Sequence, residues 1–150
     1  MRLATDGKAL RHIDFMVRPA DLRAPAGWVR AEAPFKKAVE QLEAYFAGAL
    51  RDFDTPLAPQ GTEFQRNVWR CLREIPYGET ISYSELAIRV GNPKAFRAVG
   101  LANGQNPIPI LIPCHRVIGK DGSLVGYGGG LHIKEKLLAL ERGLRATLTA

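Results

Sequence analysis

The 150-residue sequence has few cysteines, few histidines and no long apolar run. Its two cysteines, Cys71 and Cys114, are too few for a disulfide framework or a cysteine-ligated zinc site, and its three histidines lack metal-ligand spacing. No apolar run has the length of a membrane span, and the first residues lack the apolar stretch of a secretory signal. We therefore expect reduced thiols, no metal, no membrane association and a cytoplasmic location.

Positive charge is what the sequence has in excess. The formal net charge is +6, and the isoelectric point is about 9.6. Residues 1–61 hold nine Lys and Arg against eight Asp and Glu, whereas residues 62–150 hold twelve against seven. The basic surface should therefore lie in the C-terminal part. A charge excess fits a polyanionic partner or simply a well-solvated face, so motifs have to decide between the two.

The N-terminal part predicts a small antiparallel sheet and one helix. Asp6-Gly7 suits a tight hairpin turn between apolar segments at 3–5 and 9–13. A helix ending near Gly48 is indicated by four apolar residues at helical spacing behind Pro34, namely Phe35, Val39, Leu42 and Phe46. The two prolines and the glycine of residues 54–61 predict a linker, which gives domains at 1–53 and 62–150.

Three helices are predicted after the linker. Residues 62–65 and 82–85 both have the capping-box pattern of a helix start, and Gly91 ends the second helix. The first of these helices should bury Phe64, Val68, Leu72 and Ile75. Asn92 and Pro93 are typical of the start of a third helix, which runs to Gly104.

The second and third of these helices form a helix-turn-helix candidate. The third helix is crowded with small residues around one long cation, Arg97. Such a surface can approach a groove of DNA closely, although tight packing between helices explains the small residues equally well.

A candidate nucleophile follows the apolar run at 108–112, which predicts a buried strand. Cys114 comes after Pro113 and is followed by His115 and Arg116, and such cationic neighbours can lower the pKa of a thiol. Adjacent side chains of an extended segment point to opposite sides, so His115 would reach the thiol through a bridging water. The alternative is a buried inert cysteine, which is also our interpretation of Cys71.

The last helix contributes a carboxylate at the edge of its apolar stripe. The stripe is predicted at Ile133, Leu137, Leu140 and Leu144. Turned inward, Glu141 could fix the proton position on His115; turned outward, it would pair with Arg145, and the pattern alone favours the outward orientation.

The glycine-rich loop at 126–130 precedes this helix. It lacks the lysine and hydroxyl of a phosphate-binding loop, but its backbone could contact a flat heterocycle. Tyr83 or Tyr127 could stack on such a ring or donate a hydroxyl to it, or either could belong to the core.

Six stretches carry a family resemblance. They are residues 61–65, 75–80, 82–87, 97–100 with Asn106 and Pro107, 112–117, and 126–129. The run from Gly61 to Glu141 thereby resembles the methylated-DNA-protein-cysteine methyltransferases, the O6-alkylguanine-DNA alkyltransferase family. The run keeps the family's motif order over more than half of the chain.

The resemblance implies a fold and a reaction. The fold would be α+β, with a small ribonuclease-H-like antiparallel sheet and helix followed by a winged helix-turn-helix-like domain that carries the active site. The reaction would be direct reversal of O6-alkylguanine damage, with O4-alkylthymine as a further candidate substrate. Cys114 would accept the alkyl group irreversibly, without a cofactor. The implied partner is double-stranded DNA containing O6-alkylguanine, with no obligate protein partner.

The resemblance also implies roles for individual residues. His115 would activate Cys114 through water, Glu141 would orient His115, and Asn106 would shape the active-site turn. Tyr83, Tyr127 and Gly128 would hold the damaged base, and the Val117 carbonyl would bind its exocyclic amine. Arg97 would fill the gap left by the extruded base in the minor groove. The remaining DNA contacts are expected at Ser84, Asn92, Ala95, Gly100 and Lys120.

Two features depart from the family pattern. The N-terminal part looks one strand short, and Phe96 replaces an alanine that is common beside the arginine. Three other functions stay open at this point: a non-catalytic lesion-binding protein similar to the alkyltransferase-like group, a winged-helix regulator, and a cysteine hydrolase. The presence of Cys114 argues against the first, and the other two differ from the expected reaction in operator binding or repeated turnover.

Overall fold

The computed structural model describes residues 1–16, 18, 20, 23–127 and 129–143. Strands β1 (Arg2–Thr5) and β2 (Leu10–Asp14) form the expected antiparallel hairpin. The Asp6 carboxylate closes its turn by accepting hydrogen bonds from the amides of Lys8 and Ala9, and Gly7 has a φ of 95°. The predicted linker lies along β2, because the backbone of Leu10 bonds to Pro56 and Ala58.

Helix α1 (Lys36–Phe46) follows a single 3₁₀ turn, η2 (Ala33–Phe35). Its buried face is formed by Ala38, Leu42 and Tyr45. The predicted stripe was therefore wrong in part, since Val39 and Phe46 are exposed. Val39 and Phe46 lie to the side of the face that packs, and the smaller Ala38 and the amphipathic Tyr45 join Leu42 on that face.

Helix α2 (Glu63–Arg73) begins with the predicted capping box, in which Thr62 and Gln65 exchange hydrogen bonds. Val68 and Leu72 are fully buried, but Phe64 at the first turn is partly exposed, contrary to the prediction. The indole of Trp69 donates to the Ala102 carbonyl and so ties α2 to α4 (Phe96–Gly104).

Helix α3 (Tyr83–Val90) begins at Ser82 and ends at Gly91, as predicted. The predicted start of the next helix at Asn92 was wrong, because α4 begins only at Phe96. The Asn92 amide donates to the Ala87 carbonyl and the Gly91 amide to that of Ile88, which is the Schellman arrangement. The backbone of Asn92 therefore belongs to the end of α3, and a turn to Ala95 intervenes.

The segment at 108–112 is a buried turn, not the predicted strand. The Ile112 amide donates to the Ile108 carbonyl, and Ile110 has a φ of 76°, a rare conformation for a β-branched residue. The chain then forms the 3₁₀ turn η3 (Cys114–Arg116) and strand β4 (Val117–Ile118), which pairs in parallel with β3 (Ile81–Ser82).

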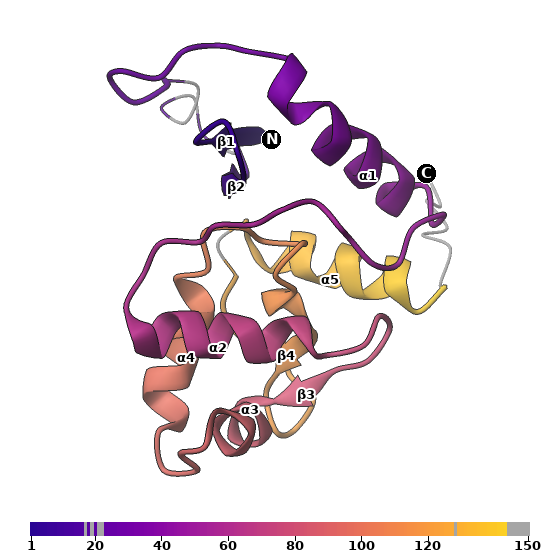
Figure 1. The fold of residues 1–150 in the computed structure, drawn as a ribbon. Helices are drawn as coiled ribbons and strands as arrows, with labels where there is room; N and C mark the ends of the chain where they lie inside the picture. Colours follow the sequence, from indigo (N-terminus) through magenta and orange to yellow (C-terminus); the bar gives the residue numbers. More distant parts are fainter. Residues whose placement is uncertain (17, 19, 21–22, 128, 144–150) are drawn as a thin grey trace.

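Helix α5 (Leu131–Glu141) lies between the two parts of the molecule (Figure 1). The hairpin and α1 are on one side of it, and α2, α3 and α4 are on the other. Of the predicted stripe, Leu137 is buried, Ile133 and Leu140 are half-buried against the core, and Leu144 lies outside the described residues. The other buried residues of this helix are Lys134, Leu138 and Glu141. None of the helices in the described part of the chain has the length and apolar character that crossing a membrane requires.

Candidate active site

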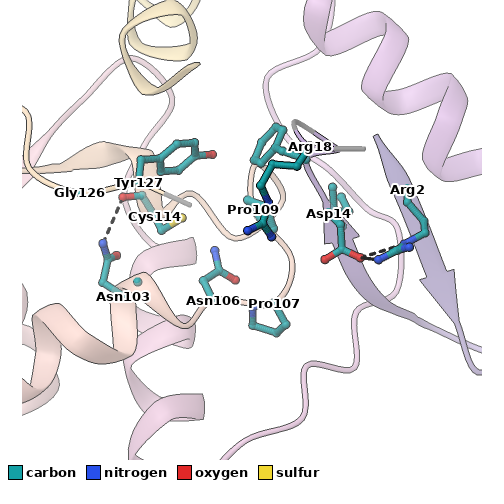
Figure 2. Close-up of a pocket in the computed structure, with 13 residues that line it drawn as sticks. Arg2, Asp14, Arg18, Asn103, Asn106, Pro107, Pro109, Cys114, Gly126 and Tyr127 are labelled. Carbon is teal, nitrogen blue, oxygen red and sulfur yellow. Dashed lines mark hydrogen bonds and ion pairs between the residues drawn. The ribbon is translucent and has the colours of Figure 1, made fainter. Parts of the chain in front are cut away.

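A cavity of about 580 Å³ opens between the N-terminal hairpin and the turn that carries Cys114. Figure 2 shows Cys114 and Tyr127 on one side of this cavity and Asp14 and Arg18 on the other. The Ile13 amide donates to the Pro107 carbonyl, so β2 is bonded directly to the active-site turn. Both parts of the molecule therefore line the space in front of the thiol.

The Cys114 thiol is protonated at rest. The residue is buried, and burial raises the pKa of its thiol to about 11, with only partial compensation from Asn106 and the Lys134 charge. The prediction of a lowered thiol pKa was therefore wrong: desolvation outweighs the Asn106 hydrogen bond and the Lys134 charge, and the neighbouring Arg116 pairs with Glu141 instead. A base has to remove this proton during any reaction at the sulfur.

His115 has the properties of that base. It is fully buried, and its Nε2 lies 2.6 Å from Oε2 of Glu141. Burial lowers the pKa of His115, so the imidazole is neutral near pH 7. A carboxylate at Nε2 keeps the proton on that nitrogen, which leaves a lone pair on Nδ1. Nδ1 has no hydrogen-bond partner among the described residues.

Glu141 turns inward. Besides His115, its carboxylate accepts hydrogen bonds from Arg116 Nε at 2.6 Å, the Tyr45 hydroxyl at 2.8 Å and the Gly78 amide at 3.4 Å. Burial raises the pKa of Glu141, but the hydrogen bonds from His115 and Arg116 outweigh it and hold the pKa at about 2. The alternative of an outward Glu141 is therefore wrong, and Arg145 lies outside the described residues.

Asn106 holds the turn before Cys114. Its side-chain amide donates to the Ile112 carbonyl at 2.7 Å, and its carbonyl oxygen accepts from the Ile108 amide at 3.0 Å. The two bonds span the left-handed Ile110, whose conformation costs about 1–3 kcal/mol. Asn106 is half-buried and lines the cavity.

Of the residues expected to hold the base, Tyr127 lines this cavity, Tyr83 and Val117 lie outside its lining, and Gly128 lies outside the described residues. The Tyr127 hydroxyl is buried and has no hydrogen-bond partner in the part of the chain that the structure describes, whereas the Tyr83 hydroxyl donates weakly to the Val125 carbonyl at 3.3 Å. The Val117 carbonyl already accepts a hydrogen bond from Lys134 Nζ at 2.6 Å. A carbonyl oxygen has two lone pairs, so the bond from Lys134 does not by itself exhaust the capacity of this oxygen to accept.

The expected DNA contacts lie around α3 and α4. Arg97 is exposed, and its guanidinium carbon is 6.0 Å from the ring centroid of the exposed Phe96. A Cβ on Gly100 would meet the Tyr83 ring at 3.6 Å, so α4 packs directly beside Tyr83. Exposed or half-buried positions are also found at Ser84, Asn92, Ala95 and Lys120.

Sequence reasoning missed three buried polar residues around the site. Tyr45 bonds to Glu141, Asn103 donates to the Cys114 carbonyl at 3.5 Å, and Lys134 donates to the Val117 and Val125 carbonyls. Lys134 precedes Glu141 by seven residues, two helical turns, so an inward Glu141 would have indicated an inward Lys134. The sequence offers no comparable signal for Tyr45 or Asn103.

Comparison with known proteins identifies the family of this chain. The family model for the 6-O-methylguanine DNA methyltransferase DNA binding domain matches residues 63–143, and the model for the ribonuclease-like domain of that family matches residues 1–59. The methylated-DNA--protein-cysteine methyltransferase of Methanosarcina acetivorans is 58% identical over 139 residues, which cover 93% of this chain and 89% of the relative.

A structural relative agrees. The crystal structure of Mycobacterium tuberculosis OGT in complex with DNA has a TM-score of 0.87 and 49% identity, and the match covers 95% of this chain and 86% of that one. Sequence motifs, fold and relatives lead to one conclusion. The chain belongs to the 6-O-methylguanine DNA methyltransferase family.

Proposed function

We propose that this protein repairs O6-alkylguanine in double-stranded DNA by transferring the alkyl group to Cys114 in a single turnover without a cofactor. The observation that carries the proposal is a set of three buried polar atoms at the Cys114 site that lack a partner within the described residues: His115 Nδ1, the Tyr127 hydroxyl and Asn103 Oδ1. Buried polar atoms are nearly always paired, so three together indicate a site that pairs with a ligand.

The proton of the thiol moves first. His115 Nδ1 takes it from Cys114 through a bridging water, and Glu141 stabilises the imidazolium that forms. Because the resting thiol has a pKa of about 11 and the resting imidazole is neutral, charge develops only during the reaction. Glu141 is already ionised and needs no rearrangement to meet that charge.

The alkyl group then moves from oxygen to sulfur. The thiolate attacks the carbon on O6 in line, the S–C bond forms, the C–O6 bond breaks, and its electron pair stays on the guanine. The guanine takes up one proton, which balances the one that His115 removed from the thiol and returns His115 to its neutral form. The Tyr83 hydroxyl stabilises the leaving base by donating a hydrogen bond to it. Cys71 cannot regenerate the thiol, because its own Sγ is buried against the Arg89 carbonyl. Each molecule therefore acts once.

Recognition of the base divides among residues that line or border the cavity. Tyr127 and the Gly128 region hold the flipped ring, and the Val117 carbonyl accepts a hydrogen bond from the exocyclic amine of that ring. Arg97 occupies the vacated place in the duplex, with Ser84, Asn92, Ala95, Gly100 and Lys120 contacting the DNA around it. A cytoplasmic location belongs to this proposal because the family acts on DNA.

Intact mass spectrometry after incubation with a duplex that contains one O6-methylguanine tests the reaction. We expect one added methyl group per molecule, found on Cys114 by peptide mapping and not on Cys71. Cys71→Ser should react like the parent, and Cys114→Ser should not react. Glu141→Gln should slow transfer and leave DNA affinity nearly unchanged.

The alternatives give different results. A lesion-binding protein or a winged-helix regulator would bind DNA without acquiring mass, and a hydrolase would release product repeatedly while staying unmodified. Methylation of Cys71, or more than one turnover per molecule, would contradict the proposed reaction.

A further inference from the structure

Tyr45 reaches the active-site carboxylate from the other part of the molecule. It lies on α1, has no exposed surface, and its hydroxyl donates to Glu141 Oε2 at 2.8 Å. Glu141 is at the end of α5, so this bond joins residues 96 positions apart. The proposed transfer mechanism uses Cys114, His115 and Glu141 and assigns no task to Tyr45.

The oxygen that Tyr45 contacts is the one that holds His115. Oε2 also accepts a hydrogen bond from Arg116 Nη2 at 3.1 Å, while Oε1 accepts hydrogen bonds from Arg116 Nε and the Gly78 amide. Three donors converge on Oε2, so its negative charge is shared among them. The Tyr45 hydroxyl therefore limits both the freedom of this oxygen and the charge that it offers to His115.

We propose that Tyr45 is a positioning residue for alkyl transfer, whose hydroxyl fixes Glu141 Oε2 and thereby sets the orientation and basicity of His115. The N-terminal part of the chain then supplies one hydrogen bond to the proton relay of the C-terminal part. This inference rests on the proposed function, since it assigns Tyr45 a role in that same reaction.

The ring and the hydroxyl of Tyr45 have separable tasks. The ring packs against Phe46, Phe53 and Tyr77, with centroids 5.5, 5.5 and 6.2 Å away. Phenylalanine would preserve these contacts and delete only the bond to Glu141. Burial and the neighbouring Glu141 charge raise the pKa of Tyr45, so its hydroxyl remains a donor at any working pH.

The charges around His115 determine the sign of the effect. His115 contacts Glu141 on α5, which in turn contacts Arg116 on η3. Lys134 on α5 and Cys114 lie near the imidazole, and Tyr77 faces Tyr45 from the loop after α2. Removing the Tyr45 hydroxyl leaves more of the Oε2 charge for the imidazole. The pKa of His115 should then rise, and His115 should stop acting as a base at a higher pH.

The test compares Tyr45→Phe with Tyr77→Phe, which deletes a hydroxyl next door that donates no hydrogen bond to Glu141 among the described residues. Single-turnover rates with free O6-benzylguanine are measured against pH. A hydrogen bond to a charged group is worth about one to two pKa units, and only part of it reaches His115 because the bond persists in both protonation states of the imidazole. The acid limb of Tyr45→Phe should therefore move up by about one pH unit. On that limb, Tyr45→Phe should react about tenfold more slowly than the parent.

Tyr77→Phe should keep the parental profile. A lower plateau with an unmoved acid limb, or failure of Tyr45→Phe to fold, would assign the hydroxyl a structural role and overturn the proposal. If the parent itself did not transfer the benzyl group to Cys114, the proposed function would fail instead. The two failures are therefore distinguishable in one experiment.

Discussion

Arg97 is a long cation on a helix of small residues, and its proposed task can be separated from the chemistry. Rotating a guanine out of a duplex costs a few kcal/mol, and a side chain that fills the vacancy offsets part of that cost. Arg97→Ala should therefore slow repair of O6-methylguanine in a duplex. Free O6-benzylguanine needs no extrusion, so the variant should react with it near the parental rate, and the ratio of the two rates is the measurement.

A matched change on α1 controls for the loss of an exposed side chain. Lys36→Ala removes a cation from the exposed start of that helix and should leave both rates unchanged. If Arg97→Ala slowed both substrates equally, Arg97 would support the fold or the pocket, and its proposed place in the duplex would be given up.

We expect the aromatic ring of Phe96 to contact the DNA together with Arg97. Its side chain is 48% exposed beside Arg97, and proteins that bend DNA from the minor groove often insert such rings between base steps. Phe96→Ala should slow duplex repair and spare the free base. Because ring and guanidinium are in contact, the double variant with Arg97→Ala should lose less than the sum of the two single losses.

Val39→Ala, which also shortens an exposed apolar side chain, provides the control on α1. Additive losses in the double variant would show that Phe96 and Arg97 act independently. A duplex rate for Phe96→Ala equal to the parental rate would remove Phe96 from the DNA contact.

The active-site residues show what a sequence can reveal about single side chains. The family resemblance of residues 112–117 predicted roles for Cys114 and His115, which the adjacent pair alone left open. The orientation of Glu141 was not, because helical spacing places it at the edge of a stripe and only tertiary contacts with Arg116 and Tyr45 compensate its burial. The thiol pKa was mispredicted for the same reason: burial is a property of the fold.

Helix ends were the most predictable elements. The side-chain caps at Thr62 and Ser82 and the left-handed Gly91 form where the pattern placed them. The prediction of a helix start at Asn92 was wrong because the backbone amide of Asn92 is used by the end of α3. The prediction of a strand at 108–112 was wrong because an apolar run indicates burial but not conformation. The tight turn depends on the Asn106 side chain and on Ile110, whose positive φ is rare for isoleucine.

Asn106→Ala should weaken this turn. The change deletes two hydrogen bonds and leaves the Ile108 amide and the Ile112 carbonyl without their side-chain partner, at a cost of about 1–3 kcal/mol in unfolding free energy. Denaturant unfolding measures that cost. Since the turn positions Cys114 itself, transfer from duplex and from free O6-benzylguanine should slow together.

Loss of rate on both substrates would distinguish the turn from α4, where Arg97→Ala should slow only the duplex reaction. Asn106→Asp provides a comparison, because its carboxylate can still accept from the Ile108 amide but cannot donate to Ile112. We expect an intermediate stability. Asn106→Ala with parental stability and parental rates on both substrates would show that the turn holds its shape without the side chain.

The whole molecule is more interdependent than its sequence suggests. Composition predicted a linker between two domains, and the linker residues Pro56 and Ala58 are hydrogen-bonded beside β2. Bonds from Ile13 to Pro107 and from Tyr45 to Glu141 then join the two parts at the active site. Such long-range pairings leave no periodic trace in a sequence, so the α+β architecture was predictable and its closure around the cavity was not.

Charge is distributed unevenly over the same two parts, and salt dependence should reveal which part binds DNA. Residues 62–150 carry five excess positive charges and residues 1–61 carry one. Each neutralised phosphate releases counterions, so the logarithm of affinity for undamaged duplex should fall linearly with the logarithm of salt concentration.

Lys120→Ala, at an exposed turn of the C-terminal part, should lower the magnitude of that slope by about 1. Lys36→Ala carries the same charge change on α1 and should leave the slope unchanged. Equal slopes for the parent and both variants would place Lys120 outside the contact, and a larger effect of Lys36→Ala would move the DNA-binding surface to the N-terminal part.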